Sequence, residues 1–145
     1  LNSWYLKAMA NFSELAKAGI GVVPDLTMRY NEYRNGKDLL IYNAPAALFF
    51  HAPKFSSTPQ TDCDTASQLV QLYAESFGLA TCWNGLIQGA ASGDHLKGFT
   101  RLAEFLHIPV ENKCYAAMTI GYPAVSLHSI PERKVDITFI NDNKL

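Results

Sequence analysis

Apolar side chains recur at helical spacing over residues 61–77, the most regular hydrophobic pattern in the chain. Thr61 or Asp62 is suited to cap this predicted helix, since both side chains can accept hydrogen bonds from its first N–H groups. Gly78 is suited to end it in a left-handed conformation, with Leu79 folding back onto the last turn. One apolar stripe of the helix is made of Ala66, Leu69, Val70, Tyr73 and Phe77.

Residues 78–85 follow the helix as a short apolar run with a glycine at each end. We predict a short, mostly buried strand between Gly78 and Gly85 and, after it, a loop without a strong structural preference. A junction of this kind can direct backbone N–H groups toward a ligand. Residues 78–85 are therefore the first candidate for a binding site.

Three other apolar segments predict strands. Residues 46–50 form an uninterrupted apolar run, which predicts a central strand covered on both faces. Residues 114–120 predict another buried strand, and residues 135–140 alternate between apolar and polar positions as an edge or half-exposed strand does. The polar stretch 53–59 predicts a surface connection, either a lid or a plain loop.

Three further segments predict helices. The first covers residues 2–18, the second opens at Pro24 and ends at Gly36, and the third begins at Thr100 and stops before Pro109. Helices that alternate with strands favour a layered sheet with helices packed on it.

Composition supports one compact domain, because 145 residues with 48% hydrophobic positions can bury a core. We expect a single domain over residues 1–145. The formal net charge of −1 gives no indication of a nucleic acid or an anionic membrane as partner. Cys63, Cys82 and Cys114 are an odd number of cysteines without Cys-x-x-Cys spacing, which favours a reducing compartment over disulfides or a zinc site. We therefore expect a cytoplasmic protein with no metal.

Few side chains in the sequence have the pattern of a catalytic group. The four histidines are widely spaced, and no Gly-x-Ser-x-Gly motif is present. Cys82 could be a nucleophile, but a small buried side chain beside Trp83 is the better-supported interpretation. Asp62 and Asp64 flank Cys63, and helix capping explains these carboxylates better than a metal site does. A protein of this kind can leave the chemistry to a cofactor.

Five short motifs, taken in order and spacing, resemble the nitroreductase family of FMN-dependent oxidoreductases. They are Asn43-Ala44-Pro45 before an apolar strand, the spacing of Asp62, Ala66 and Gln68, Gly78-Leu79-Ala80-Thr81-Cys82-Trp83 with Gly85, Gly121-Tyr122-Pro123, and Arg133-Lys134. The resemblance covers residues from about 40 to 140, and residues 1–39 are only loosely similar.

The resemblance implies an α+β fold, in which a nitroreductase-like mixed sheet is flanked by helices. It also implies a homodimer with two FMN sites at the subunit interface, and a C-terminal strand over residues 135–140 that exchanges into the partner. The cofactor-binding residues that it implies are Cys82, Trp83, Asn84, Gly85, Arg133 and Lys134.

In the family, the loop matched by Trp83-Asn84-Gly85 lies along the flavin ring, with backbone N–H groups near N5 and O4. Donors there would stabilise negative charge on the ring, and Gly85 lacks a Cβ that would keep the backbone away. Arg133 and Lys134 match the basic pair that contacts the FMN phosphate. From the residues alone, an alternative stays open, in which Arg133 and Lys134 are a solvated basic pair that balances neighbouring acidic residues.

The activity implied is electron transfer from NAD(P)H through FMN to a nitroaromatic, quinone or similar acceptor, with no catalytic side chain. Family members normally begin with an Arg-Ser-x-Arg motif, which this chain lacks. The chain is then either the C-terminal part of a longer protein or a shortened relative that binds flavin poorly, and its start inside a predicted helix favours the first. The alternative function is a non-catalytic dimerisation or ligand-binding domain that kept the fold.

Overall fold

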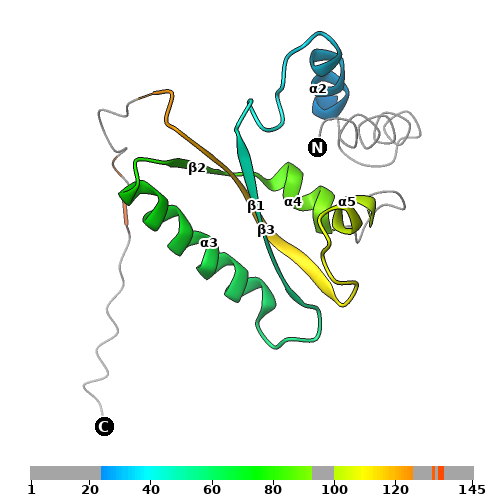
Figure 1. The fold of residues 1–145 in the computed structure, drawn as a ribbon, viewed down its shortest axis with the longest axis vertical. Coiled ribbons are helices and arrows are strands. Elements are labelled where there is room, and N and C mark those ends of the chain that lie inside the picture. Colours follow the sequence, from blue (N-terminus) through cyan, green and yellow to red (C-terminus); the bar gives the residue numbers. More distant parts are fainter. Residues whose placement is uncertain (1–23, 93–99, 126–131, 133, 136–145) are drawn as a thin grey trace.

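The computed structural model describes residues 24–92 and 100–125, together with residues 132, 134 and 135 (Figure 1). The elements are α2 (Pro24–Arg34), β1 (Ala46–Pro53), α3 (Pro59–Ser76), β2 (Ala80–Trp83), α4 (Gly85–Ser92), α5 (Thr100–Phe105) and β3 (Asn112–Gly121). The predicted helix over residues 2–18 lies outside the described residues, as does the predicted strand over 135–140 beyond its first residue.

The three described strands form an antiparallel sheet in the order β1-β3-β2. The predicted buried strand over residues 114–120 is confirmed as β3, where Cys114 and Met118 are fully buried. The prediction that residues 46–50 form the central strand is wrong for this sheet, because β1 lies at its edge and is half-buried. An uninterrupted apolar run indicates cover on both faces, and it carries no information on how many neighbours the strand pairs with.

A β-bulge decides which side chains of β3 share a face. Two successive residues of β1 pair with Ala116 and Cys114, so the register skips Tyr115. The extra residue turns Cys114 to the same face as Ala117. Two core clusters result, one of Leu40, Ile87 and Ala117 and one of Ala91, Leu102, Ile108 and Cys114, and Phe49 packs against both.

Helix α3 lies on one side of the strands, and α4 and α5 lie on the other (Figure 1). The predicted cap at Thr61 or Asp62 is wrong, because α3 begins earlier, at Pro59, with Thr58 before it. A proline fits the first turn, where its missing N–H costs nothing and its fixed φ is already helical. The predicted surface connection over 53–59 is correspondingly shorter, since Pro53 ends β1.

The predicted end of α3 is confirmed. Gly78 has a φ of +69°, its N–H donates to the Glu75 carbonyl at 2.9 Å, and the Leu79 N–H donates to the Ala74 carbonyl at 3.1 Å. This pair of bonds is the Schellman arrangement. The end of α2 is confirmed in the same way, because Gly36 follows it with a φ of +86°.

Helix α5 ends on the same pair of bonds, with a histidine at the left-handed position. His107 has a φ of +55°, its N–H donates to the Glu104 carbonyl at 3.0 Å, and the Ile108 N–H donates to the Ala103 carbonyl at 2.9 Å. For residues other than glycine, this conformation costs roughly 1 kcal/mol.

We therefore expect His107→Gly to raise the free energy of unfolding by about 0.5–1 kcal/mol. Gly78→Ala is the matched change in the opposite direction and is expected to lower it by about 1 kcal/mol. Urea unfolding followed by circular dichroism measures both. Equal midpoints for His107→Gly and the wild type would contradict a strained histidine at this helix end.

Candidate functional site

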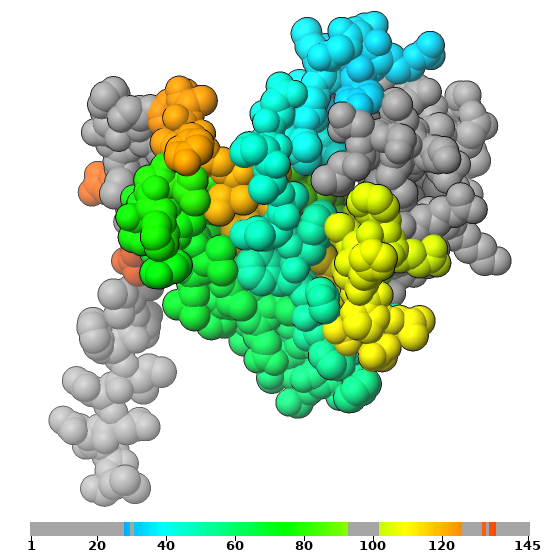
Figure 2. All heavy atoms as spheres, in the orientation of Figure 1, coloured from blue at the N-terminus to red at the C-terminus, as the bar shows by residue number. Residues whose placement is uncertain are grey.

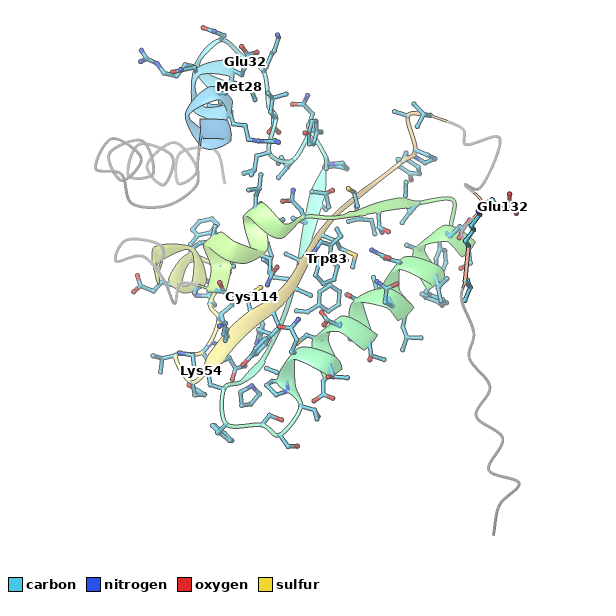
Figure 3. The ribbon with its side chains drawn as sticks, turned by 180° about the vertical axis from the view of Figure 1, so that it is seen from behind. Met28, Glu32, Lys54, Trp83, Cys114 and Glu132 are labelled. Carbon is cyan, nitrogen blue, oxygen red and sulfur yellow. The ribbon has the colours of Figure 1, made fainter. Side chains whose placement is uncertain are left out.

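The strand predicted between Gly78 and Gly85 is confirmed as β2, but its predicted burial is wrong. Ala80, Cys82 and Trp83 are exposed, and 39% of the Trp83 surface is accessible. The reason is the position of β2, which pairs only with β3 at one edge of the described sheet. Cys82 is accordingly not the small buried side chain that the sequence indicated, and Trp83 lies at the end of the strand where the chain enters α4 (Figure 3).

The loop predicted after the stretch 78–85 is also wrong, because residues 85–92 form helix α4 directly after β2. The Asn84 side-chain oxygen accepts hydrogen bonds from the Leu86 and Ile87 N–H groups at 3.1 and 3.2 Å, which caps the helix. Ile87 and Ala91 are buried on one face. Two glycines lower the helix propensity of this segment, and the cap and the burial outweigh them. An asparagine before apolar residues at helical spacing was the pattern that could have predicted α4.

Asn84 makes further bonds through its other polar groups. Its side-chain NH2 donates to the Leu40 carbonyl at 2.7 Å, and its backbone N–H donates to the Ala117 carbonyl at 2.9 Å. Its own carbonyl accepts the Gln88 N–H at 3.1 Å. The backbone N–H of Asn84 is therefore bonded to the sheet. The backbone N–H of Gly85, by contrast, is the first of a helix and has no carbonyl partner within that helix.

Space is open in front of Gly85. A Cβ added there would meet no atom within 4 Å, and its φ lies outside the left-handed region. An accessible backbone beside an exposed strand and a helix N-terminus suits a flat, partly anionic ligand. The residues at the β2–α4 junction thus fit a ligand such as a flavin ring, which would approach the backbone here.

A tight turn, which we call the 38–43 turn, lies against this junction and was not predicted. The carboxylate of Asp38 accepts the backbone N–H groups of Leu40, Ile41 and Asn43 at 2.9, 3.0 and 3.0 Å. Tyr42 and Asn43 both have left-handed φ values, +52° and +57°. The Arg29 guanidinium donates to the Leu39 carbonyl and to the Tyr42 hydroxyl. Aspartate and asparagine, here Asp38 and Asn43, are typical turn residues.

The same bonds alter the acidity of Asp38. Burial raises the pKa of its carboxyl, but the N–H groups of Asn43, Ile41, Leu40 and Tyr42 outweigh burial and hold the pKa below the ordinary 3.8. Because the folded pKa is lowered, this stabilisation is complete above the ordinary pKa and is lost as the pH falls through the folded value.

We expect Asp38→Asn to lower the free energy of unfolding at neutral pH by about 1 kcal/mol, through weaker bonds to the turn. The difference from the wild type should shrink as the pH drops below 3.8. Urea unfolding at a series of pH values tests this expectation. A difference that stays constant down to strongly acidic pH would contradict the proposed role of the carboxylate.

The predicted phosphate-binding pair is placed only in part. Lys134 is exposed, and Arg133 lies outside the described residues. Glu132 lies past the carboxyl end of α3, away from Trp83 (Figure 3). Glu132, two residues before Lys134 in the chain, therefore does not lie at the β2–α4 junction within one chain.

Cys114, another candidate for chemistry, lies in the core. Burial raises the pKa of the Cys114 thiol to about 11, which keeps it protonated and unreactive at neutral pH. In the part of the chain that the structure describes, no group of three or more His, Cys, Asp or Glu side chains could hold a metal ion. None of the described helices is long and apolar enough to cross a membrane.

A model of the nitroreductase family matches residues 6–122 of the chain. The chain belongs to the nitroreductase family. The resemblance that the motifs indicated is confirmed, and the match reaches well into residues 1–39, further than the motifs alone predicted. Family membership also confirms the prediction of a nitroreductase-type oxidoreductase. No curated protein matches the chain.

Solved structures confirm the predicted nitroreductase-like α+β fold. A nitroreductase with bound FMN from Bacteroides fragilis aligns with a TM-score of 0.72 at 18% identity, over 96% of this chain and 69% of that chain. A nitroreductase with bound FMN from Desulfitobacterium hafniense has a TM-score of 0.63 at 22% identity, over 94% and 69%. An FMN-dependent nitroreductase from Clostridium difficile has a TM-score of 0.59 at 16% identity, over 93% and 73%.

Proposed function

We propose that the protein is an FMN-dependent oxidoreductase that takes electrons from NAD(P)H and passes them to a nitroaromatic, quinone or similar acceptor. The family match over residues 6–122 is the observation that carries this proposal. The similar structures with bound FMN support FMN as the cofactor.

FMN, when bound, supplies the electron-transfer chemistry, and the chain binds and orients it. In this proposal Gly85 holds the ring, because its N–H has no partner within α4 and no Cβ blocks the approach. A hydrogen-bond donor at this point would stabilise negative charge on the bound ring. Cys82 and Trp83 are exposed on β2, directly before this helix start.

Asn84 takes a different part in this proposal from the one that the resemblance implied. Its backbone N–H is bonded to the Ala117 carbonyl, and its side chain caps α4. Its contribution is therefore to orient the first turn of the helix. The donor toward the ring is the next amide, that of Gly85.

Arg133 and Lys134 would hold the FMN phosphate, as the resemblance implies. Since Glu132 lies away from Trp83 within one chain (Figure 3), we place this contact in a homodimer. There the C-terminal segment of one copy would complete the site of the other.

An exposed apolar surface on α3 supports the homodimer. Leu69, Leu72, Tyr73 and Phe77 are 62–69% exposed, so most of the predicted stripe lies outside the core of one chain. Leu69, Tyr73 and Phe77 line a groove of about 390 Å³, whose lining also includes Ala74, Leu79 and Ile120. Figure 2 shows α3 (green) on the open surface, where no other described element covers it in this view. Contiguous apolar surface of this kind is typical of an association site.

Tyr73 stands in this surface with its ring edge-on to Phe77, at 4.9 Å between centroids. We expect Tyr73→Glu to weaken dimerisation by at least about 100-fold, because a carboxylate would lose its water at an apolar interface. Light scattering after size-exclusion chromatography measures the oligomeric state. Gln68→Glu, an exposed polar position of α3, is the control, and a Tyr73→Glu protein that stays dimeric would contradict this interface.

The proposed function is tested on protein expressed from its complete reading frame. We expect a yellow protein with FMN bound, which oxidises NADH or NADPH in the presence of a nitroaromatic or quinone. A colourless protein that takes up no FMN from an excess would overturn the proposal. We also propose a cytoplasmic location, in keeping with three cysteines that form no disulfide in the structure.

The alternative is a non-catalytic dimerisation or ligand-binding domain of the same fold. The exposed apolar surface of α3 favours it as much as it favours a dimeric enzyme. Dimeric protein that oxidises neither nicotinamide in the presence of FMN and acceptor would select this alternative.

A further inference from the structure

We propose that Asn84 is a positioning residue that couples the 38–43 turn to the flavin-facing amide of Gly85. This inference rests on the proposed function, because it assumes that a flavin ring lies at the β2–α4 junction. It assigns a role to the Asn84 side chain and to a turn of which the motifs included only Asn43.

The Asn84 side chain joins two segments that are far apart in the sequence. Its oxygen accepts the Leu86 and Ile87 N–H groups of α4, and its NH2 group donates to the Leu40 carbonyl at 2.7 Å, a contact across 44 positions. The oxygen and the nitrogen belong to one planar amide. A displacement of the turn at Leu40 therefore acts on the first turn of α4, where Gly85 lies.

Packing places the two segments on one core. Leu40 of the turn is buried and clusters with Ile87 of α4 and Ala117 of β3. The Asn84 N–H donates to the carbonyl of the same Ala117 at 2.9 Å. The turn, the start of α4 and strand β3 thus meet around Asn84. Because cores are closely packed, a displacement of one of these segments shifts the others.

The turn holds a conformation that needs external support. Tyr42 and Asn43 are both left-handed, which is costly for a bulky side chain such as tyrosine. Asp38 supports the turn from within by accepting three N–H groups. Asn84 supports it from the junction. If flavin fixes the Gly85 amide, it therefore also stabilises the turn, and coupling of this kind is reciprocal.

Two substitutions separate the two functions of the side chain. Asn84→Asp keeps oxygens that accept the Leu86 and Ile87 N–H groups but loses the donor to Leu40. Asn84→Ser keeps a capping hydroxyl without adding charge, and it is too short to reach the Leu40 carbonyl. Both variants should fold, because both residues are good helix caps.

The first measurement is amide hydrogen exchange of residues 38–43 in flavin-free protein. We expect exchange to be about five- to tenfold faster in both variants, as for the loss of one hydrogen bond. The second measurement is FMN titration by fluorescence quenching, where we expect a dissociation constant about five- to tenfold higher. Added FMN should slow exchange of the turn in the wild type and slow it less in Asn84→Ser.

Asn112→Asp is the matched control, because the Asn112 side chain also joins two segments that are far apart in the sequence, strands β3 and β1, through a 2.8 Å contact to His51. It should leave exchange of the turn and FMN affinity unchanged. Wild-type protein that binds FMN, together with variants of equal affinity and unchanged exchange, would overturn this inference. Wild-type protein that takes up no FMN would overturn the proposed function, and exchange in the flavin-free variants would still decide whether Asn84 holds the turn.

Discussion

Replacing Ile87 with alanine is expected to lower the free energy of unfolding by about 2–5 kcal/mol. Ile87 is 2% exposed and forms a core cluster with Leu40 and Ala117, beneath the β2–α4 junction. Alanine would remove three carbon atoms and leave a cavity that the central strand and the 38–43 turn cannot readily fill. The better helix propensity of alanine offsets less than about 0.7 kcal/mol of this loss.

Leu86→Ala is the matched control, because Leu86 is the neighbouring residue of the same helix and is 36% exposed. Its truncation should cost less than about 1 kcal/mol. Urea unfolding followed by circular dichroism compares the two variants at equal protein concentration. Equal losses for Ile87→Ala and Leu86→Ala would contradict the inward orientation of Ile87.

Gly85→Val is expected to weaken FMN binding by about 100-fold or more, which corresponds to roughly 3 kcal/mol. The substitution should not disturb the fold, because an added Cβ meets no atom within 4 Å and the backbone is not left-handed. Two methyl groups would instead occupy the space through which a ring approaches the Gly85 N–H. Loss of affinity without loss of stability is the expected result, measured by FMN titration and by thermal unfolding of flavin-free protein.

Gly89→Val provides the control for this experiment. Gly89 lies on the same helix, and an added Cβ there also meets no atom within 4 Å. It should leave FMN affinity within about twofold of the wild type, while both valines raise helix propensity by a few tenths of a kcal/mol. Wild-type affinity in Gly85→Val would show that the flavin ring does not lie against this residue.

Features that depend on a few neighbouring residues were predictable from the sequence. Gly36 and Gly78 end α2 and α3, as predicted, and both are left-handed, because this conformation is a property of one residue and the turn before it. The strand at Cys114 was predictable because its mostly apolar run suits cover on both faces. The nitroreductase resemblance rested on the order of such local motifs.

Features that depend on contacts between distant segments were not predictable in this way. β1 was predicted as a central strand and lies at an edge of the described sheet. The predicted stripe of α3 lies mostly on the surface of one chain, with Leu69 and Tyr73 exposed. A hydrophobic pattern marks the side chains that avoid water, and it does not distinguish the core of one chain from an interface between two.

The β2–α4 junction contains both kinds of feature, those that were predictable from the sequence and those that were not. The sequence by itself determined that a short strand follows a helix ended by glycine, and that Gly85 carries no Cβ to keep a ligand away. Only the tertiary structure decided that β2 is exposed at an edge of the described sheet, that α4 starts directly after it, and that Asn84 bonds to the Leu40 carbonyl. The physical reason is that helix ends and glycine conformations are set by local backbone geometry, whereas burial and long-range hydrogen bonds depend on which segments meet in space.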